Sequence, residues 1–188
     1  MGSIRTFIAF DTPEPIKEKM LALQSELKAS NADVRWEPKE KFHATIKFLG
    51  NVDENQLPNV IKTIEEVSSA HSLFDVTYQN LGVFPNKKYP RVIWIGCENP
   101  SEKLQHLKDA LDGALVPYGF EVEKRQFHPH ITLGRVKSLR GLKYLTPMLE
   151  NLTFEPQSTS INEILVMKST LKPQGSEYEI VKTIYLLS

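Results

Sequence analysis

The chain has 188 residues, of which 40% are hydrophobic and 24% are charged, and its formal net charge is zero. This length supports one substantial core, or two small lobes that share one, and the composition is ordinary for a globular protein. The zero net charge argues against a protein that grips long nucleic acid through many phosphates, but it leaves room for a small basic pocket that binds one phosphate.

Hydrophobic periodicity predicts strands and helices that alternate irregularly along the chain. The strands are expected at residues 4–10, 33–36, 42–50, 73–84, 91–97, 130–135, 161–170 and 177–188. The helices are expected at residues 12–30, 53–70, 101–118 and 142–150, the last with a break at Pro147. Short polar turns are expected to link 33–36 to 42–50 and 73–84 to 91–97, and such connections require antiparallel neighbours.

This mixture of helices and hairpins predicts an α+β fold rather than a set of parallel βαβ units. The chain also looks loosely duplicated, because each half contains a helix, a strand with the same short motif and a further helical stretch. No linker or low-complexity segment separates the halves. We therefore predict a single two-lobed domain over residues 1–188.

The cellular location of the protein can be predicted from its cysteine content and from its apolar segments. Its one cysteine, Cys97, excludes an internal disulfide, and the apolar run RVIWIGC around it predicts a buried thiol. No apolar stretch approaches the length of a membrane span, and the first residues lack the apolar core of a signal peptide. We expect a cytoplasmic protein that does not bind membranes, and we expect a monomer.

A His-x-Thr-aliphatic motif occurs twice, as HATI at residues 43–46 and as HITL at residues 130–133. Because alternate residues of a strand point to one face, His43 projects with Thr45, and His130 projects with Thr132. An imidazole can transfer a proton near neutral pH, and a hydroxyl can donate a hydrogen bond to a phosphoryl oxygen. Two such pairs facing each other would supply the base and the acid that hydrolysis of a phosphodiester needs.

Two neighbouring residues fit the same chemistry. Arg135 lies five positions after His130 and could offer a charged fork to a phosphate. Phe48 lies five positions after His43, and its ring could stack on a base or ribose. Strict alternation places Phe48 on the opposite face of the strand from His43, so this role requires a bulge or a twist between them.

The paired motifs and their surroundings resemble the 2H phosphoesterases, and among them the bacterial and archaeal RNA 2′,3′-cyclic phosphodiesterases, also described as 2′-5′ RNA ligases. The resemblance runs through IRTFIAFD, FHATIKFLGNV, LGVFPNKKYPRVIWIGC, FHPHITLGRV and ILVMKSTLKPQGSEYEIV. It implies a pseudo-symmetric α+β fold in which each lobe is an antiparallel sheet with helices on its outer face, and an active-site cleft between the lobes. It also implies hydrolysis of a 2′,3′-cyclic phosphate to a 2′-phosphate, without a metal or other cofactor.

The expected partner is therefore an RNA with a 2′,3′-cyclic phosphate end, or a cyclic nucleotide, and reversible 2′-5′ ligation is left open. One histidine must accept a proton from water while the other protonates the leaving 3′ oxygen. A cation lowers the pKa of a neighbouring imidazole, so Arg135 favours a neutral His130. We therefore expect His130 to be the proton acceptor and His43 to be the proton donor.

Two other functions compete with this hypothesis. His128 and His130 form an HxH pattern that His43 could join as a metal site, but no Cys cluster or acidic partner completes the ligand set, and both threonines would go unexplained. Pro129 is poorly placed in a strand, so His128 is expected at the surface or behind His130. The second alternative is a non-catalytic module that binds RNA ends or nucleotides, but such a module would more naturally use Arg or Lys where the two histidines stand.

Overall fold

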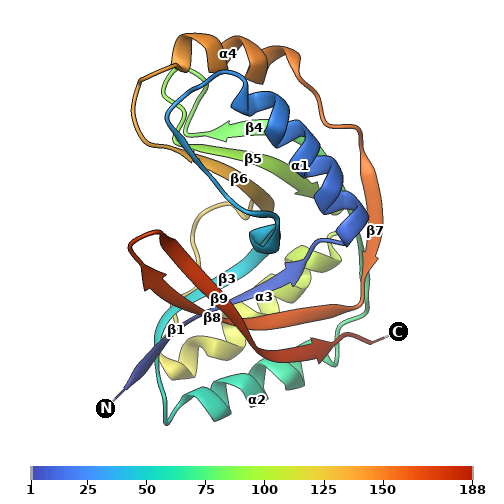
Figure 1. Ribbon diagram of the computed structural model, residues 1–188. Coiled ribbons are helices and arrows are strands. Elements are labelled where there is room, and N and C mark those ends of the chain that lie inside the picture. Colours follow the sequence, from blue (N-terminus) through green and yellow to red (C-terminus); the bar gives the residue numbers. More distant parts are fainter. Residues whose placement is uncertain (1, 188) are drawn as a thin grey trace.

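In the computed structural model, which describes residues 2–187, nine strands form one antiparallel sheet that curls so that its two halves face each other (Figure 1). The strands are β1 (Ser3–Asp11), β2 (Val34–Trp36), β3 (His43–Asp53), β4 (Phe74–Phe84), β5 (Val92–Glu98), β6 (His130–Val136), β7 (Gln157–Ile161), β8 (Glu163–Lys172) and β9 (Gly175–Tyr185). They lie in the order β7–β4–β5–β6–β3–β1–β8–β9, and the short strand β2 pairs with β6.

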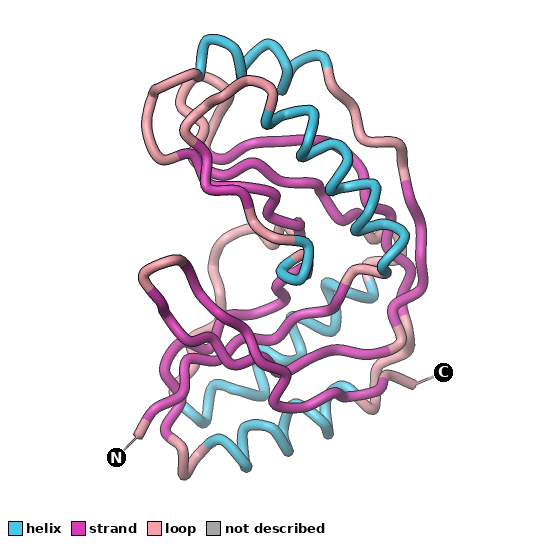
Figure 2. The backbone as a smooth tube through the Cα atoms, in the orientation of Figure 1, coloured by secondary structure: helices cyan, strands magenta, loops and turns pink. Residues whose placement is uncertain are grey.

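The helices cover the outer faces of the curled sheet (Figure 2). They are α1 (Glu14–Lys28), α2 (Leu57–Ser68), α3 (Lys103–Leu115) and α4 (Leu142–Asn151), with short 3-10 helices η1 (Lys39–Lys41) and η2 (Val116–Tyr118). Helices α2 and α3 pack together against β1, β3, β8 and β9, which we call lobe 1. Helices α1 and α4 accompany β2 and β4–β7, which we call lobe 2. The predicted two-lobed α+β fold is confirmed.

The helices form where apolar residues recur at helical spacing. In α1 the residues on the buried side include Ile16, Met20, Leu23 and Leu27, and Pro15 sits in the first turn, where its missing N–H has no intrahelical partner to lose. Cys97 is buried on β5 as predicted, and burial raises the pKa of its thiol. Within residues 2–187, no helix is long and apolar enough to cross a lipid bilayer.

The two lobes are joined through β3 and β6, at the two motifs. Among the described residues, these strands share one register pair, Ala44 opposite Ile131. Both of these side chains are fully buried. Each stands between the histidine and the threonine of its own motif, so strand alternation turns both His-x-Thr pairs to the other face of the sheet. The junction of the lobes therefore sets where the four motif side chains lie.

The predicted hairpin between residues 33–36 and 42–50 is wrong. Strand β2 does not pair with β3; it pairs with β6, with Arg35 opposite Arg135 and Trp36 opposite Gly134. Backbone hydrogen bonds extend this ladder at both ends, from Glu37 N to Leu133 O and from Lys137 N to Asp33 O. The chain then turns through η1 and crosses to lobe 1. A crossover of this kind and a hairpin both begin with a polar turn, so the sequence does not distinguish them.

Two smaller expectations also differ from the structure. Helix α4 runs without a break through Pro147, because the buried Leu145 and Leu149 hold both sides of it against lobe 2. Strand β7 was not predicted, since QSTSI is polar and gains its place by pairing with β4. The predicted last strand included Ser188, which lies outside the described residues.

A buried ion network fastens β3 to α3 and to the loop that leads to β6. Asp112 on α3 accepts hydrogen bonds from Lys47 and from Lys108, both at 2.6 Å, and all three side chains are almost fully buried. Lys47 also donates to the carbonyl of Glu121 at 2.9 Å. Burial by itself would raise the pKa of the Asp112 carboxyl, but the hydrogen bonds from the two lysines outweigh it, so that pKa lies below its ordinary value.

Replacement of Asp112 by alanine should destabilise the protein by roughly 3–5 kcal/mol, because it leaves the ammonium group of Lys47 buried without a counter-ion and that of Lys108 with only the Glu123 carboxylate at 3.6 Å. The measurement is the free energy of unfolding by urea. Asp109→Ala is the matched control: Asp109 is exposed on the same helix, and its loss should change stability by no more than about 0.5 kcal/mol. Equal stability of the two variants would contradict a structural role for the network.

Candidate active site

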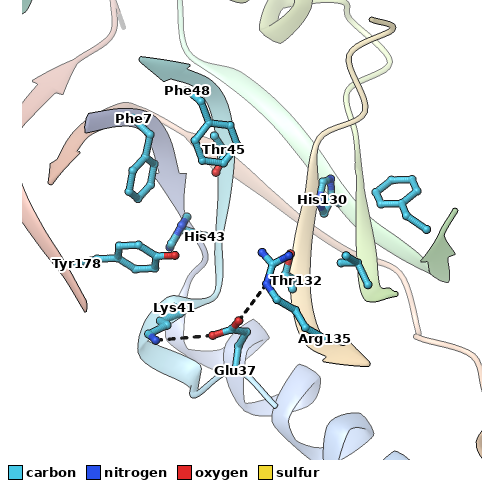
Figure 3. Close-up of a pocket in the computed structure, with 12 residues that line it drawn as sticks. Phe7, Glu37, Lys41, His43, Thr45, Phe48, His130, Thr132, Arg135 and Tyr178 are labelled. Carbon is cyan, nitrogen blue, oxygen red and sulfur yellow. Dashed lines mark ion pairs between the residues drawn. The ribbon is translucent and has the colours of Figure 1, made fainter. Parts of the chain in front are cut away.

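A cavity of about 310 Å³ lies between the lobes, and both motifs contribute to its walls (Figure 3). We call it the central cavity. Its lining residues are Phe7, Glu37, Lys41, His43, Thr45, Phe48, Phe84, Val92, His130, Thr132, Arg135 and Tyr178. The structure thus brings together all six residues that the sequence singled out. The imidazoles of His43 and His130 come from facing strands of different lobes (Figure 3).

His43 is packed between aromatic rings of lobe 1. The Phe7 ring stacks on it at 5.2 Å between centroids, and the Tyr178 ring meets it edge-on at 5.1 Å. Burial lowers the pKa of His43 to about 4. Asp11 is the register partner of His43 across β1 and β3, and the charge of its carboxylate raises this pKa, but less than burial lowers it. In the substrate-free protein His43 is therefore neutral at pH 7.

His130 is held by a hydrogen bond as well as by packing. Its Nδ1 donates to the carbonyl oxygen of His128 at 2.7 Å, and the Phe84 ring meets the imidazole edge-on at 5.1 Å. Since Nδ1 carries the proton, Nε2 of the neutral ring is left as an acceptor. The pKa of His130 is lowered, first by burial and then by the charges of His128 and Arg135, although the bond to the His128 carbonyl opposes this.

Arg135 is oriented by Glu37, which the sequence had not singled out. The Arg135 Nε lies 3.4 Å from Oε1 of Glu37, and Lys41 Nζ lies 3.7 Å from Oε2 (Figure 3). Arg35 Nη2 approaches the same carboxylate at 3.9 Å. Only 11% of the Glu37 side chain is exposed, so one nearly buried carboxylate gathers three cations at the edge of the cavity. This leaves the cavity with a positive charge suited to a phosphate.

Phe48 lies on the same face as His43, although strict alternation places it on the other. The register of β1 and β3 shifts between Thr45, which is opposite Ala9, and Lys47, which is opposite Ile8. Within the described part of β1, Ile46 has no register partner, and both Ile46 and Lys47 point into the core. This bulge returns Phe48 to the cavity, where its ring is 66% exposed and 5.9 Å from that of Phe7.

His128 is exposed and does not join the other two histidines as a ligand set. Its ring packs on Trp94 at 4.7 Å and on Phe84 at 5.3 Å, and its carbonyl holds His130. Within residues 2–187, no three His, Cys, Asp or Glu side chains are grouped so that they could hold a metal ion.

Several lining residues were missed by the sequence analysis, because they enter the cavity from other strands. Phe7 comes from β1, Phe84 and Val92 from the β4–β5 hairpin, and Tyr178 from β9. Of the missed residues, Lys41 was the easiest to predict from the sequence, since it precedes His43 by two positions in KFHAT. Glu37 gave no signal, because its role depends on the pairing of β2 with β6.

Comparison with known proteins places the chain in a family. The LigT-like phosphoesterase model matches twice in succession, at residues 10–94 and 95–178. The RNA 2′,3′-cyclic phosphodiesterase of Methanothermobacter thermautotrophicus is 34% identical over 176 residues, covering 93% of this chain and 95% of its own. The protein of the same name from Aquifex aeolicus is 32% identical over 188 residues, covering 99% of both chains.

Solved structures show the same fold. A crystal structure of a protein from Thermus thermophilus gives a TM-score of 0.81 at 22% identity, covering 97% of this chain and 98% of that one. E. coli LigT complexed with 3′-AMP gives a TM-score of 0.78 at 23% identity, covering 99% of both. The double match, one copy for each His-x-Thr motif, accounts for the internal duplication, and the chain belongs to the family of LigT-like phosphoesterases.

Proposed function

We propose that the protein hydrolyses the 2′,3′-cyclic phosphate at an RNA end to a 2′-phosphomonoester, by acid–base catalysis with two histidines and without a metal ion. The observation that carries the proposal is the pair of imidazoles facing each other across one cavity, each with a threonine hydroxyl beside it. Two relatives that are 34% and 32% identical to this chain over nearly its whole length are named RNA 2′,3′-cyclic phosphodiesterases, which supports this substrate.

In the proposed step, water attacks the phosphorus and gives a proton to Nε2 of His130. The bond from phosphorus to the 3′ oxygen breaks, the electron pair stays on that oxygen, and His43 protonates it. The hydroxyls of Thr45 and Thr132 donate to the non-bridging phosphoryl oxygens, and the Arg135 guanidinium stabilises their negative charge. With a 5′ hydroxyl in place of water, the same transfers would give a 2′-5′ linkage.

The proposed acid must be protonated, and the histidines reach the required charge states only after the substrate binds. Both imidazoles are neutral at pH 7 in the substrate-free protein, because burial lowers both pKa values. The bound ester carries a negative charge, which raises the pKa of a nearby imidazole. Asp11 acts in the same direction on His43, against the charges of Lys17 and Lys41. At His130 the charges of His128 and Arg135 act against protonation, while the hydrogen bond to the His128 carbonyl favours it. We assign the base role to His130, because its bond to the His128 carbonyl leaves Nε2 as a free acceptor, and the acid role to His43, which has the Asp11 carboxylate nearby.

The remaining features of the proposal concern the substrate and its setting. The exposed ring of Phe48 stacks on the base or ribose of the cyclic-ended nucleotide. We further propose that residues 1–188 act as one two-lobed domain, as a monomer and in the cytoplasm. The division of one acid–base site between two lobes of a continuous sheet supports the single domain.

The assignment of acid and base can be tested by changing the leaving group. On a dinucleotide with a 2′,3′-cyclic end, His43→Ala and His130→Ala should each lower kcat by about 10²–10⁴. On a p-nitrophenyl phosphodiester, whose leaving oxygen needs little protonation, His43→Ala should lose much less activity, while His130→Ala stays impaired. His106→Ala, which alters an exposed histidine on α3, is the control. The reverse pattern would exchange the two roles, and binding without turnover by the wild type would refute the enzyme.

Metal independence has its own test. Hydrolysis of the cyclic-ended dinucleotide should continue at the wild-type rate after dialysis against EDTA, because proton transfer and hydrogen bonding by residues of the chain carry the chemistry. A loss of activity that added zinc restores would instead make His128 and His130 part of a metal site.

The low pKa of His43 predicts a change of stability with pH. The pKa is about 4 in the folded protein against an ordinary 6.5, so protons bind the unfolded chain more strongly. The resulting stabilisation, roughly 3 kcal/mol, is complete above pH 6.5 and is lost as the pH falls towards 4. Urea unfolding across this range should show a flatter curve for His43→Gln than for the wild type, while His106→Gln keeps the wild-type curve. Parallel curves for His43→Gln and the wild type would contradict the lowered pKa.

A further inference from the structure

The central cavity continues into a second cavity of about 360 Å³. The two share Phe7, Glu37, Lys41, Phe48, Arg135 and Tyr178. The residues that only the second cavity has are Arg5, Thr6, Arg35, Gly50, Ser169 and Ser176. A phosphate bound between the two histidines would leave this second space free, so the cleft is longer than a single cyclic phosphate needs.

The second cavity is strongly cationic, and we call it the cationic cavity. In the part of the chain that the structure describes, it is lined by Arg5, Arg35, Lys41 and Arg135 against the single carboxylate of Glu37. This leaves an excess of three positive charges at one place in a chain whose net charge is zero. A third cavity, on the Phe84 side, has no such excess: Lys47 is paired with the buried Asp112, and Arg125 is accompanied by Glu123.

The fold forces these cations together. Arg35 and Arg135 are direct register partners in β2 and β6, an arrangement in which like charges repel each other. Glu37 forms ion pairs with Arg135, Lys41 and Arg35, at 3.4, 3.7 and 3.9 Å, but one carboxylate shared among three cations offsets only part of this repulsion. Among the described residues, nothing accepts a hydrogen bond from the buried Nε of Arg35. A bound anion would reduce the repulsion between these cations. Without an anion, the repulsion would remain.

The β8–β9 hairpin closes the cationic cavity from lobe 1. Gly175, the first residue of β9 after the turn, has φ +131°, and a Cβ placed there would lie 3.6 Å from Lys41 Nζ and 3.9 Å from Arg35 Nη1. The turn therefore lies directly against the cations. Ser169 and Ser176, one on each strand of the hairpin, line the same space and offer hydroxyl donors beside the positive charges. Cations and hydroxyls together are the donors that bind a phosphodiester.

We propose that the cationic cavity binds the phosphodiester that joins the cyclic-ended nucleotide to the nucleotide before it. The proposal rests on the proposed function, and it makes the substrate an oligonucleotide end rather than a cyclic mononucleotide. Arg5 and Arg35 are the residues specific to this contact, since Lys41 and Arg135 also line the central cavity.

The test compares two dinucleotides that carry the product 2′-phosphate and differ only in their linkage, a phosphodiester or an uncharged methylphosphonate. Calorimetric titration of the wild-type protein should show at least about tenfold tighter binding of the charged linkage. The difference should shrink with added salt, because about one phosphate contact is involved. Equal affinity for the two ligands would overturn the proposal without any mutation that could disturb folding.

Two variants locate the contact. Arg5→Ala and Arg35→Ala should each reduce the preference for the charged linkage, and Arg140→Ala should retain it, because Arg140 is an exposed arginine that lines neither cavity. An unchanged preference in both cavity variants would refute the assignment. Hydrolysis of a dinucleotide with a 2′,3′-cyclic end to its 2′-phosphate is followed in parallel. Its absence would refute the proposed function, whereas the difference in binding between the two linkages would still decide the cationic cavity.

Discussion

The pairing of Ala44 with Ile131 is the constraint on which the site depends, because it joins the two halves of the sheet at the centres of the two motifs. Both side chains are buried, so they face the core and the flanking residues must face the cleft. Had the strands met one residue earlier or later, one motif would present its apolar residue to the cavity and bury its histidine. The register is therefore fixed by core packing, and the acid–base geometry follows from it.

The site contains groups whose placement costs free energy, and the residues around the junction hold them there. Two imidazoles are desolvated, and three cations gather around one carboxylate. Stiff neighbours hold these groups in place: aromatic rings around His43, the His128 carbonyl at His130, and the Lys47–Asp112–Lys108 network behind β3. Because Lys47 is next to the bulge at Ile46, the network also fixes the point at which Phe48 turns back to the cavity.

Much of this could be predicted from the sequence, because it depends on local patterns. Apolar spacing located most strands and all four helices of the described chain, and alternation placed His43 with Thr45 and His130 with Thr132. The rest depends on pairings between distant segments. The sequence does not reveal that β2 crosses to β6, which brings Glu37 and Arg35 to the cleft, nor that Ile46 bulges, which reverses the face of Phe48. Strand β7 was hidden because its polar residues show no apolar alternation.

The two halves repeat the same motif, but an acid–base reaction needs them to differ, and the differences lie in the flanking strands. On the His43 side, β1 contributes Asp11, whose charge favours an imidazolium against the charges of Lys17 and Lys41. On the His130 side, the charges of His128 and Arg135 disfavour it. The hydrogen bond to the His128 carbonyl favours it, and the same bond fixes the ring with Nε2 free to accept a proton. The cations outside the motifs are also one-sided, since Arg5 and Arg35 lie beside Arg135 and Lys41 rather than around both histidines equally. A duplicated scaffold thus supplies two equivalent positions for the proton transfers that we propose, and its unequal surroundings are the features that would give each position its own chemistry and the substrate a single direction of binding.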